Sequence, residues 1–427
     1  MWRILVLSLG MAALAPAQSA AGADIGQALT LTDAIGAALD THPAVGEAEA
    51  AARDALAGVH GALSGYRPRV TLRASAGYSD RRAAFDNQPV FEESASPASV
   101  SVELSQRLYA SGRRAIETRH SQLGYERARL DIERIEDDIA RETAFAWFEI
   151  LASRERLGIE IDARRSLVEA LEGARAREAR GAATQTDIAQ AETRLAEAEA
   201  RIGVARAELE IAGARFQSLT ELAPAGVEGA LAFAPALPGT LAEAIEEALA
   251  HSLDLEQSRL GERQAALATA AASRRNGATI DLSATAQRVD DPSPVLDRDD
   301  EARAVVSLTL PLYSGGETRA ALRSALARRD QARLSTLRTR TELTAQVRQI
   351  WARLEASKTG LAAQERRVSA ARDALRGVEQ GREAGLTSQL DVLDALRELQ
   401  LARLAQLEAR HEQIRARVEM AVLTRGL

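Results

Sequence analysis

The chain repeats itself at a constant spacing of 204 residues. The residues that recur at this spacing are Tyr109 and Tyr313, Gly112 and Gly316, Trp147 and Trp351, Gly181 and Gly385, and Asp187 and Asp391. Each half reads as alternating strands, a Tyr-x-x-Gly break, a very long helical segment, a glycine turn and a return helix. One register kept over about 80 residues means that the helices of the two halves have matched lengths. A repeat of this size favours a structural assembly over an enzyme active site.

The composition is typical of long helices. Of the 427 residues, 27% are charged and only 3% are aromatic, a profile found in helical and coiled-coil proteins. The net charge is -7, and the arginines are interleaved with acidic residues instead of forming a basic face. This pattern argues against nucleic acid as a partner.

Residues 1–23 are predicted to be a secretory signal peptide. Arg3 supplies the positive charge, residues 4–14 the apolar core, and Ala21-Gly22-Ala23 a cleavage site flanked by small residues. No other stretch approaches the ~20 apolar residues of a transmembrane helix. The chain has no cysteine, which removes disulfides and a lipid-anchoring N-terminal cysteine. We therefore expect an exported protein whose contact with a membrane, if any, is made by strands.

The two repeats are assigned to residues 24–225 and 226–427, because a stretch rich in proline and glycine separates them. Alternating apolar and polar residues predict strands at about 69–79, 99–109, 278–288 and 303–313. Runs of about ten residues fit tilted membrane-crossing strands, and they also fit a soluble hairpin with one wet face. Export without an apolar helix, and the long helices that follow, favour the membrane interpretation.

Helical hairpins are predicted at about 113–222 and 317–424. Between Gly112 and Gly181 there is no proline and little glycine, so about 66 residues at ~1.5 Å each form a rod of roughly 100 Å. A compact domain of ~400 residues has a radius of gyration of only about 21 Å, so the molecule must be elongated. The second return helix carries two apolar stripes, which predicts packing against two neighbours, as in the wall of a tube.

These features together resemble the TolC-type outer-membrane efflux proteins. The residues that carry the resemblance are the duplicated halves, Leu108-Tyr109-x-x-Gly112, Leu312-Tyr313-Ser-Gly315-Gly316, and Gly385 followed by Asp391-Val392-Leu393-Asp394-Ala395. The resemblance implies a mostly α fold with a small β part, in which three chains form a 12-stranded β-barrel in outer-membrane lipid. It also implies a periplasmic α-helical barrel that meets a periplasmic adaptor and an inner-membrane pump of the RND or ABC type.

The expected function is the outer-membrane exit duct of a tripartite efflux or type I secretion system, extending into the periplasm. From the residues alone, four strands cannot close a barrel, and open sheet edges are not tolerated in lipid, so the chain must oligomerise. Two or three copies would satisfy this argument, and the resemblance implies a homotrimer. The alternative is a periplasmic coiled-coil adaptor, which would have one hairpin inserted in compact β-domains. The cargo and the type of pump stay open.

We find no catalytic constellation in the sequence and expect neither an enzyme nor a bound metal or cofactor. The histidines are scattered without ligand spacing at His42, His60, His120, His251 and His411. The candidate sites lie at the turns of the two hairpins. Gly181 and Gly385 break the outgoing helices, and Thr184 and Thr387 are predicted to be the N-caps of the return helices. The resemblance implies that Arg180-Gly181-Ala182 and Ala384-Gly385-Leu386 dock the adaptor.

Asp391 and Asp394 lie three residues apart on one helical face. In a solvated coiled coil such a pair is usually ordinary surface charge. Under threefold symmetry, however, six carboxylates would surround a narrow mouth and attract cations, and the resemblance implies a periplasmic aperture at this pair. Family members can hold the closed state with tyrosine and arginine side chains, where this chain has Arg382 and Thr387. How a closed state is locked here is therefore left open.

Overall fold

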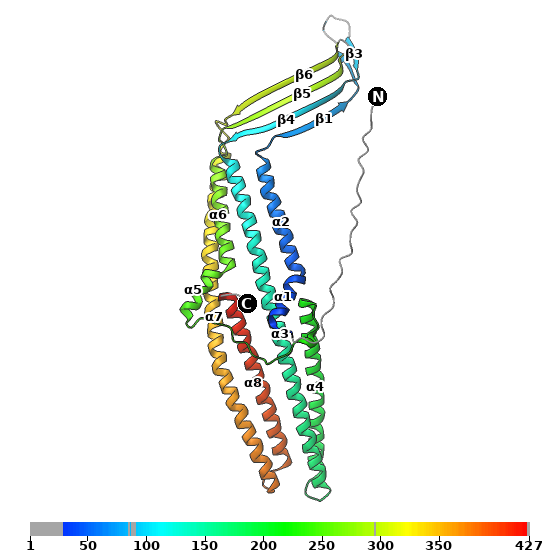
Figure 1. Cartoon of the computed structure of the whole chain (residues 1–427), viewed down its shortest axis with the longest axis vertical. Coiled ribbons are helices and arrows are strands. Elements are labelled where there is room, and N and C mark those ends of the chain that lie inside the picture. The colour runs from blue at the N-terminus through cyan, green and yellow to red at the C-terminus, as the bar shows by residue number, and fades with distance from the viewer. Residues whose placement is uncertain (1–28, 84–85, 87–90, 294–295, 425–427) are drawn as a thin grey trace.

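The computed structural model describes residues 29–83, 86, 91–293 and 296–424, and the predicted signal peptide lies outside them. The molecule is elongated, with a sheet at one end and two long helical hairpins at the other (Figure 1). The helices are α1 Leu31–Thr41, α2 Pro43–Ser64, α3 Arg113–Glu178, α4 Gln185–Thr220, α5 Leu241–His251, α6 Leu253–Ser273, α7 Glu317–Glu383 and α8 Gln389–Thr424. The strands are β1 Arg69–Ala76, β2 Ser79–Ala83, β3 Phe91–Ala95, β4 Ala98–Ala110, β5 Thr279–Ser293 and β6 Leu296–Thr309.

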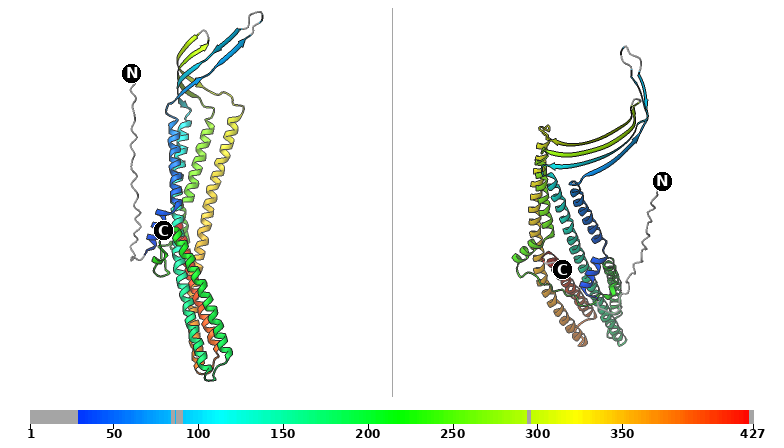
Figure 2. Two further views of the ribbon diagram at one scale, coloured as in Figure 1. Left: turned by 90° about the vertical axis from the view of Figure 1, so that its right-hand side faces the viewer. Right: turned by 45° about the horizontal axis from the view of Figure 1, so that its top comes forward.

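Each half is built on one very long helix with two shorter helices stacked along it. The long helices α3 and α7 contain 66 and 67 residues, so each is about 100 Å long. The upper part of α3 packs against α2 and its lower part against α4, and α7 packs in the same way against α6 and α8 (Figures 1 and 2). In each half, the two shorter helices therefore lie end to end along the long helix and together cover most of its length.

Apolar cores lie at mid-height, where the short helices α1 and α5 cover the long ones. In the first half, Trp147 meets Phe216 edge-on with ring centroids 6.1 Å apart, in a cluster that includes Ala34 of α1. In the second half, Ile350 and Met420 form the corresponding cluster with α5. Trp147 and Trp351 therefore belong to two different clusters, and the first cluster also includes Leu407, Ile414 and Val418 of α8.

The main sheet combines both repeats in the strand order β1-β4-β5-β6, with all neighbours antiparallel. Strand β4 of the first half pairs with β5 of the second, with Val102 opposite Ala286. Strand β6 ends at Thr309, earlier than the predicted limit of 313, and Pro311 lies two residues on and cannot donate to a sheet. The sequence also failed to predict the two-stranded ribbon β2-β3 at the far end of the sheet.

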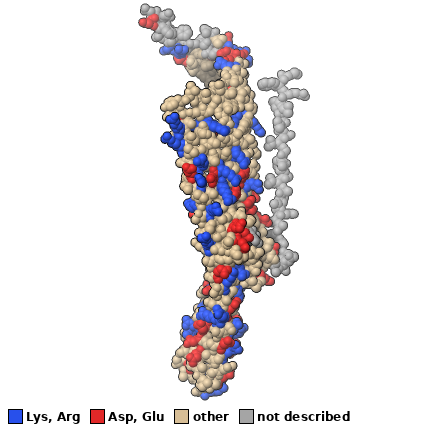
Figure 3. All heavy atoms as spheres, turned by 90° about the vertical axis from the view of Figure 1, so that its left-hand side faces the viewer, with Lys and Arg blue, Asp and Glu red and all other residues tan. Residues whose placement is uncertain are grey.

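Charged residues of both signs are distributed along the helical part, as the face in Figure 3 shows. Many form ion pairs one helical turn apart, for example Arg134 with Asp138 at 3.2 Å. Such exposed pairs contribute little to stability and keep the surface hydrated. Within the described part of the chain, no helix combines the length and the apolar character needed to cross a membrane.

Candidate functional site

The main sheet has one apolar and one polar face. Because side chains alternate along a strand, the pairing of Leu72 with Val102 and of Val102 with Ala286 places these residues on one face. The large side chains on this face are exposed to the surroundings; Leu72, for example, is 67% exposed. Towards the β2-β3 end this face becomes charged, because Arg288 lies opposite Val100 and pairs with Asp300. The exposed apolar part of the face indicates contact with lipid or with another protein surface.

The opposite face carries polar and charged side chains. Arg107 donates from Nε to Asp281 Oδ1 at 2.7 Å, and Arg73 pairs with Glu103 across β1 and β4. Ser105 and Ser283 lie on this face between the charged pairs. The charges are paired within one chain, which suits a face that lines a wet passage.

Both outer strands of this sheet leave one edge unpaired. In the described part of the chain, β1 pairs only with β4 and β6 pairs only with β5. Free backbone donors and acceptors along an edge recruit another strand, and in lipid they must be satisfied. The sheet is therefore incomplete without further strands.

The two hairpin turns, at the end of the molecule farthest from the sheet, have the same backbone structure (Figure 1). Gly181 has φ +70° and Gly385 has φ +74°, the left-handed region that favours glycine. The amide of Ala182 donates to the Arg177 carbonyl, and that of Leu386 donates to the Gly381 carbonyl at 2.8 Å. This bond over five residues terminates both helices in the Schellman motif. No neighbouring atom lies within 4 Å of a Cβ built on either glycine, so the turns are open at the surface.

The return helices begin with reciprocal caps. Thr184 is the N-cap of α4 as predicted, and its side chain accepts from the Asp187 amide at 3.2 Å. The prediction of Thr387 as the second N-cap is wrong, because Ser388 makes these bonds with Asp391. Ser388 is also the residue 204 positions after Thr184. Thr387 instead donates its hydroxyl to the Val378 carbonyl at 2.8 Å and packs over the last turn of α7.

The two candidate aperture residues have different surroundings. Asp391 accepts from both the amide and the hydroxyl of Ser388 at 2.7 Å, and these bonds lower the pKa of the Asp391 carboxyl. Asp394 lies one turn further along α8, with Oδ1 3.5 Å from Arg194 Nη2 of α4 and a side chain that is 58% exposed. Asp391 therefore caps its own helix, whereas Asp394 faces the other hairpin of the same chain.

Near the turns, the two hairpins are joined by polar contacts. Gln389 is buried, donates to the Ala170 carbonyl at 3.3 Å and accepts a hydrogen bond from Arg177. Burial lowers the pKa of the Arg177 guanidinium, and the charge of Arg382 lowers it further. Arg382 thus lies near a like charge, and the described residues form no ion pair with it.

A buried polar group further along the hairpins was missed in the sequence. Glu160 of α3 is only 4% exposed, and its Oε2 accepts from Gln400 Nε2 of α8 at 2.6 Å and from Arg201 Nε of α4 at 3.2 Å. The available signal was Gln400 itself, a polar residue beside Leu396 and Leu399 on an apolar helix face. This group joins three helices from both repeats.

The sheet with two unlike faces and free edges, continuous with two long helical hairpins, fits a membrane channel protein. The chain belongs to the outer membrane efflux protein family, whose profile matches residues 34–220 and 244–424. The two matched segments correspond to the two repeats. The predicted family is thereby confirmed, and the match supports the duct interpretation and not the adaptor.

Among curated proteins, the chain is similar to the outer membrane efflux protein BepC of Brucella suis biovar 1 (strain 1330). The two are 27% identical over 245 residues, which cover 57% of this chain and 54% of BepC. The chain thus spans about half the length of this curated relative in the alignment.

Solved structures with a similar fold include the outer membrane protein VceC of Vibrio cholerae, with a TM-score of 0.79 at 18% identity. That comparison covers 93% of this chain and 96% of VceC. The open-state MtrE outer membrane channel of Neisseria gonorrhoeae has a TM-score of 0.74 at 19% identity and covers 93% and 89% of the two chains. These similarities confirm the predicted fold class, a mostly helical chain with a small sheet.

Proposed function

We propose that this protein is the outer-membrane exit duct of a tripartite efflux or type I secretion system. It conducts passively what an inner-membrane pump delivers through a periplasmic adaptor. The observation that carries this proposal is the four-stranded sheet with one apolar face, one polar face and two free edges, continuous with helices of about 100 Å. A soluble adaptor would expose this apolar sheet face to water, which is unfavourable.

In this proposal the chain acts as a homotrimer. Three copies join the edge of β1 to the edge of β6 of the next copy and close a barrel of 12 strands, which is wide enough for a wet lumen. The apolar face meets outer-membrane lipid, and the face with the Arg107–Asp281 pair lines the passage. The hairpins then extend as a helical tube into the periplasm.

The hairpin turns are the proposed docking surface for the adaptor. They comprise Arg180-Gly181-Ala182 and Ala384-Gly385-Leu386, the latter including a leucine that is 82% exposed. An exposed large apolar side chain at the end of a charged rod is a suitable anchor for a partner. Arg180 donates from Nε to the Ala176 carbonyl at 3.0 Å, which leaves its two terminal guanidinium nitrogens for a partner.

The aperture is proposed to lie at Asp391 and Asp394. Asp391 is held at the start of α8 by its cap, and the largely exposed carboxylate of Asp394 has one arginine neighbour at 3.5 Å. Three copies of each would concentrate negative charge at the periplasmic mouth and favour cations there.

The decisive experiment is native mass spectrometry of the detergent-purified protein combined with conductance in planar bilayers. We expect three subunits per particle and ion-conducting steps after insertion. A folded monomer that stays in aqueous buffer without detergent would contradict the duct. The adaptor alternative predicts no conductance from the purified protein alone.

A further inference from the structure

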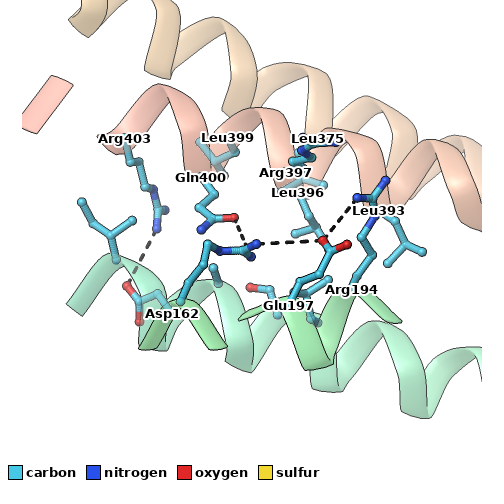
Figure 4. Close-up of a pocket in the computed structure, with 15 residues that line it drawn as sticks. Asp162, Arg194, Glu197, Leu375, Leu393, Leu396, Arg397, Leu399, Gln400 and Arg403 are labelled. Atoms are coloured by element: carbon cyan, nitrogen blue, oxygen red, sulfur yellow. Dashed lines mark hydrogen bonds and ion pairs between the residues drawn. The ribbon is translucent and has the colours of Figure 1, made fainter. Parts of the chain in front are cut away.

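A cavity of about 180 Å³ lies between the two hairpins, where α3 and α4 face α7 and α8 (Figure 4). Its apolar lining residues include Ile159, Leu167, Leu375, Leu393, Leu396 and Leu399. Its charged lining residues are four arginines, Arg194, Arg201, Arg397 and Arg403, and two carboxylates, Asp162 and Glu197. An apolar cavity with a few converging polar groups is the usual form of a small-molecule site.

Two of these arginines are already satisfied by acceptors of this chain. Arg201 donates to Glu160 at 3.2 Å and to Gln400 at 3.3 Å. Arg194 has carboxylate oxygens of Glu197 at 3.4 Å and of Asp394 at 3.5 Å. Neither guanidinium needs a further anion.

The other two arginines, Arg403 and Arg397, have fewer acceptors within this chain. The Nε of Arg403 is buried and has no hydrogen-bond partner, and its nearest carboxylate, Asp162, lies 3.8 Å from a different nitrogen. Arg397 also lines the cavity, and no hydrogen bond or ion pair of this residue occurs in the described part of the chain. A buried donor without an acceptor is unfavourable, so the Nε of Arg403 favours a ligand that carries an acceptor.

We propose that this cavity binds a small aromatic carboxylate of the benzoate class. An apolar cavity of about 150 Å³ is known to hold benzene, so 180 Å³ accommodates one aromatic ring. The ring packs against the leucine side chains, and the carboxylate accepts from Arg403 Nε and pairs with Arg397. Guanidinium groups match the planar geometry of a carboxylate, and the four arginines outnumber the two carboxylates of the lining, which disfavours a ligand cation.

The test uses the intact protein in detergent and the probe benzoate. Saturation-transfer NMR and equilibrium dialysis should show saturable benzoate binding, with benzylamine and benzyl alcohol about ten- to a hundredfold weaker because they lack the charge-assisted bonds. Equal binding of all three compounds, or no saturable benzoate binding, would overturn the proposal. The measurement does not depend on export, so a failure of the duct proposal leaves it interpretable.

Variants test the assigned groups. Arg403→Gln and Arg397→Gln should each weaken benzoate binding about tenfold. Arg372→Gln should leave binding unchanged, because Arg372 is an exposed arginine of α7 that does not line the cavity. Leu396→Trp should abolish binding, because the larger side chain would fill the space between the apolar lining residues of the cavity. If that variant fails to assemble, Ser166→Leu serves as a milder filling change. Unchanged affinity in both arginine variants would exclude this cavity as the site.

Discussion

Ser388 and Asp391 cap the second return helix reciprocally. The Ser388 amide donates to Asp391 Oδ2 at 2.7 Å, and the Asp391 amide donates to Ser388 Oγ at 3.2 Å. Thr184 and Asp187 make the same pair of bonds in the first repeat, at 2.8 Å and 3.2 Å. The repeated aspartate is therefore explained by helix capping in both halves, and any role of Asp391 at an aperture is additional to it.

The first prediction concerns this cap. Asp391→Ala should speed hydrogen exchange in the first turn of α8, because that turn loses its reciprocal bonds. Since capping lowers the pKa of Asp391 below the ordinary 3.8, the cap is intact above that value and is lost as the pH falls through the lowered pKa. Asp187→Ala is the matched control and should loosen the start of α4 without altering conductance. Unchanged exchange in both variants would contradict the capping role.

Asp394 offers a cleaner test of the aperture. Its exposed ion pair with Arg194 at 3.5 Å contributes little to stability, so Asp394→Asn should leave thermal unfolding nearly unchanged. In planar bilayers the same variant should show weaker block by a trivalent cation and lower cation preference. Asp373→Asn, an exposed aspartate of α7 paired with Arg376, is the control. Equal cation sensitivity of wild type and Asp394→Asn would leave Asp394 as surface charge.

The hairpin turns should be sensitive to backbone geometry. Gly181→Val and Gly385→Val introduce a β-branched residue at φ +70° and +74°, which is strained, and should reduce crosslinking to the adaptor while membrane insertion persists. Gly203→Val is the control, because Gly203 is exposed within α4 and has no positive φ. Leu386→Asp should reduce docking with the turn intact. Undiminished crosslinking in every variant would place the docking surface elsewhere.

Neighbouring residues on β4 distinguish the two faces of the sheet. Val102→Arg places a charge on the apolar face and should cost about 2–4 kcal/mol in the bilayer, which reduces the assembled fraction in outer-membrane extracts. Ser101→Arg lies on the polar face opposite Gln287 and should assemble normally while changing ion selectivity. The reverse result would mean that the faces are assigned the wrong way round.

Glu160 should be required for the junction between the hairpins. Glu160→Ala leaves Arg201 Nε and Gln400 Nε2 without their acceptor and should destabilise the protein by up to about 3 kcal/mol. Glu160→Gln should have a smaller effect, because the glutamine side chain keeps an oxygen that can accept a hydrogen bond and Arg201 is partly exposed to water. Chemical denaturation in detergent measures both, with the exposed Glu355→Ala as the control. Equal stability of wild type and Glu160→Ala would show that water satisfies the arginine.

The sequence by itself determined the repeat, the long helices and the alternation of the strands. These features depend on local periodicity, because a helix repeats every 3.6 residues and a strand every 2. The pair Gly181 and Gly385 was also readable, since only a positive φ explains glycine at both turns. The N-cap at Ser388 follows from the 204-residue spacing, because Ser388 lies 204 positions after Thr184, whereas the neighbouring Thr387 is not at that spacing.

Only the tertiary structure decided which side chains meet between the repeats. Gln400 and Glu160 are 240 residues apart, and their contact depends on how α8 is rotated against α3. The arginine-lined cavity and the β4-β5 pairing depend in the same way on packing between repeats. Periodicity determines which face of a helix or strand is apolar. It does not determine which element covers that face, because the hydrophobic effect is non-directional and many pairings bury the same residues. The partner of each face is therefore decided by the packing of all elements together.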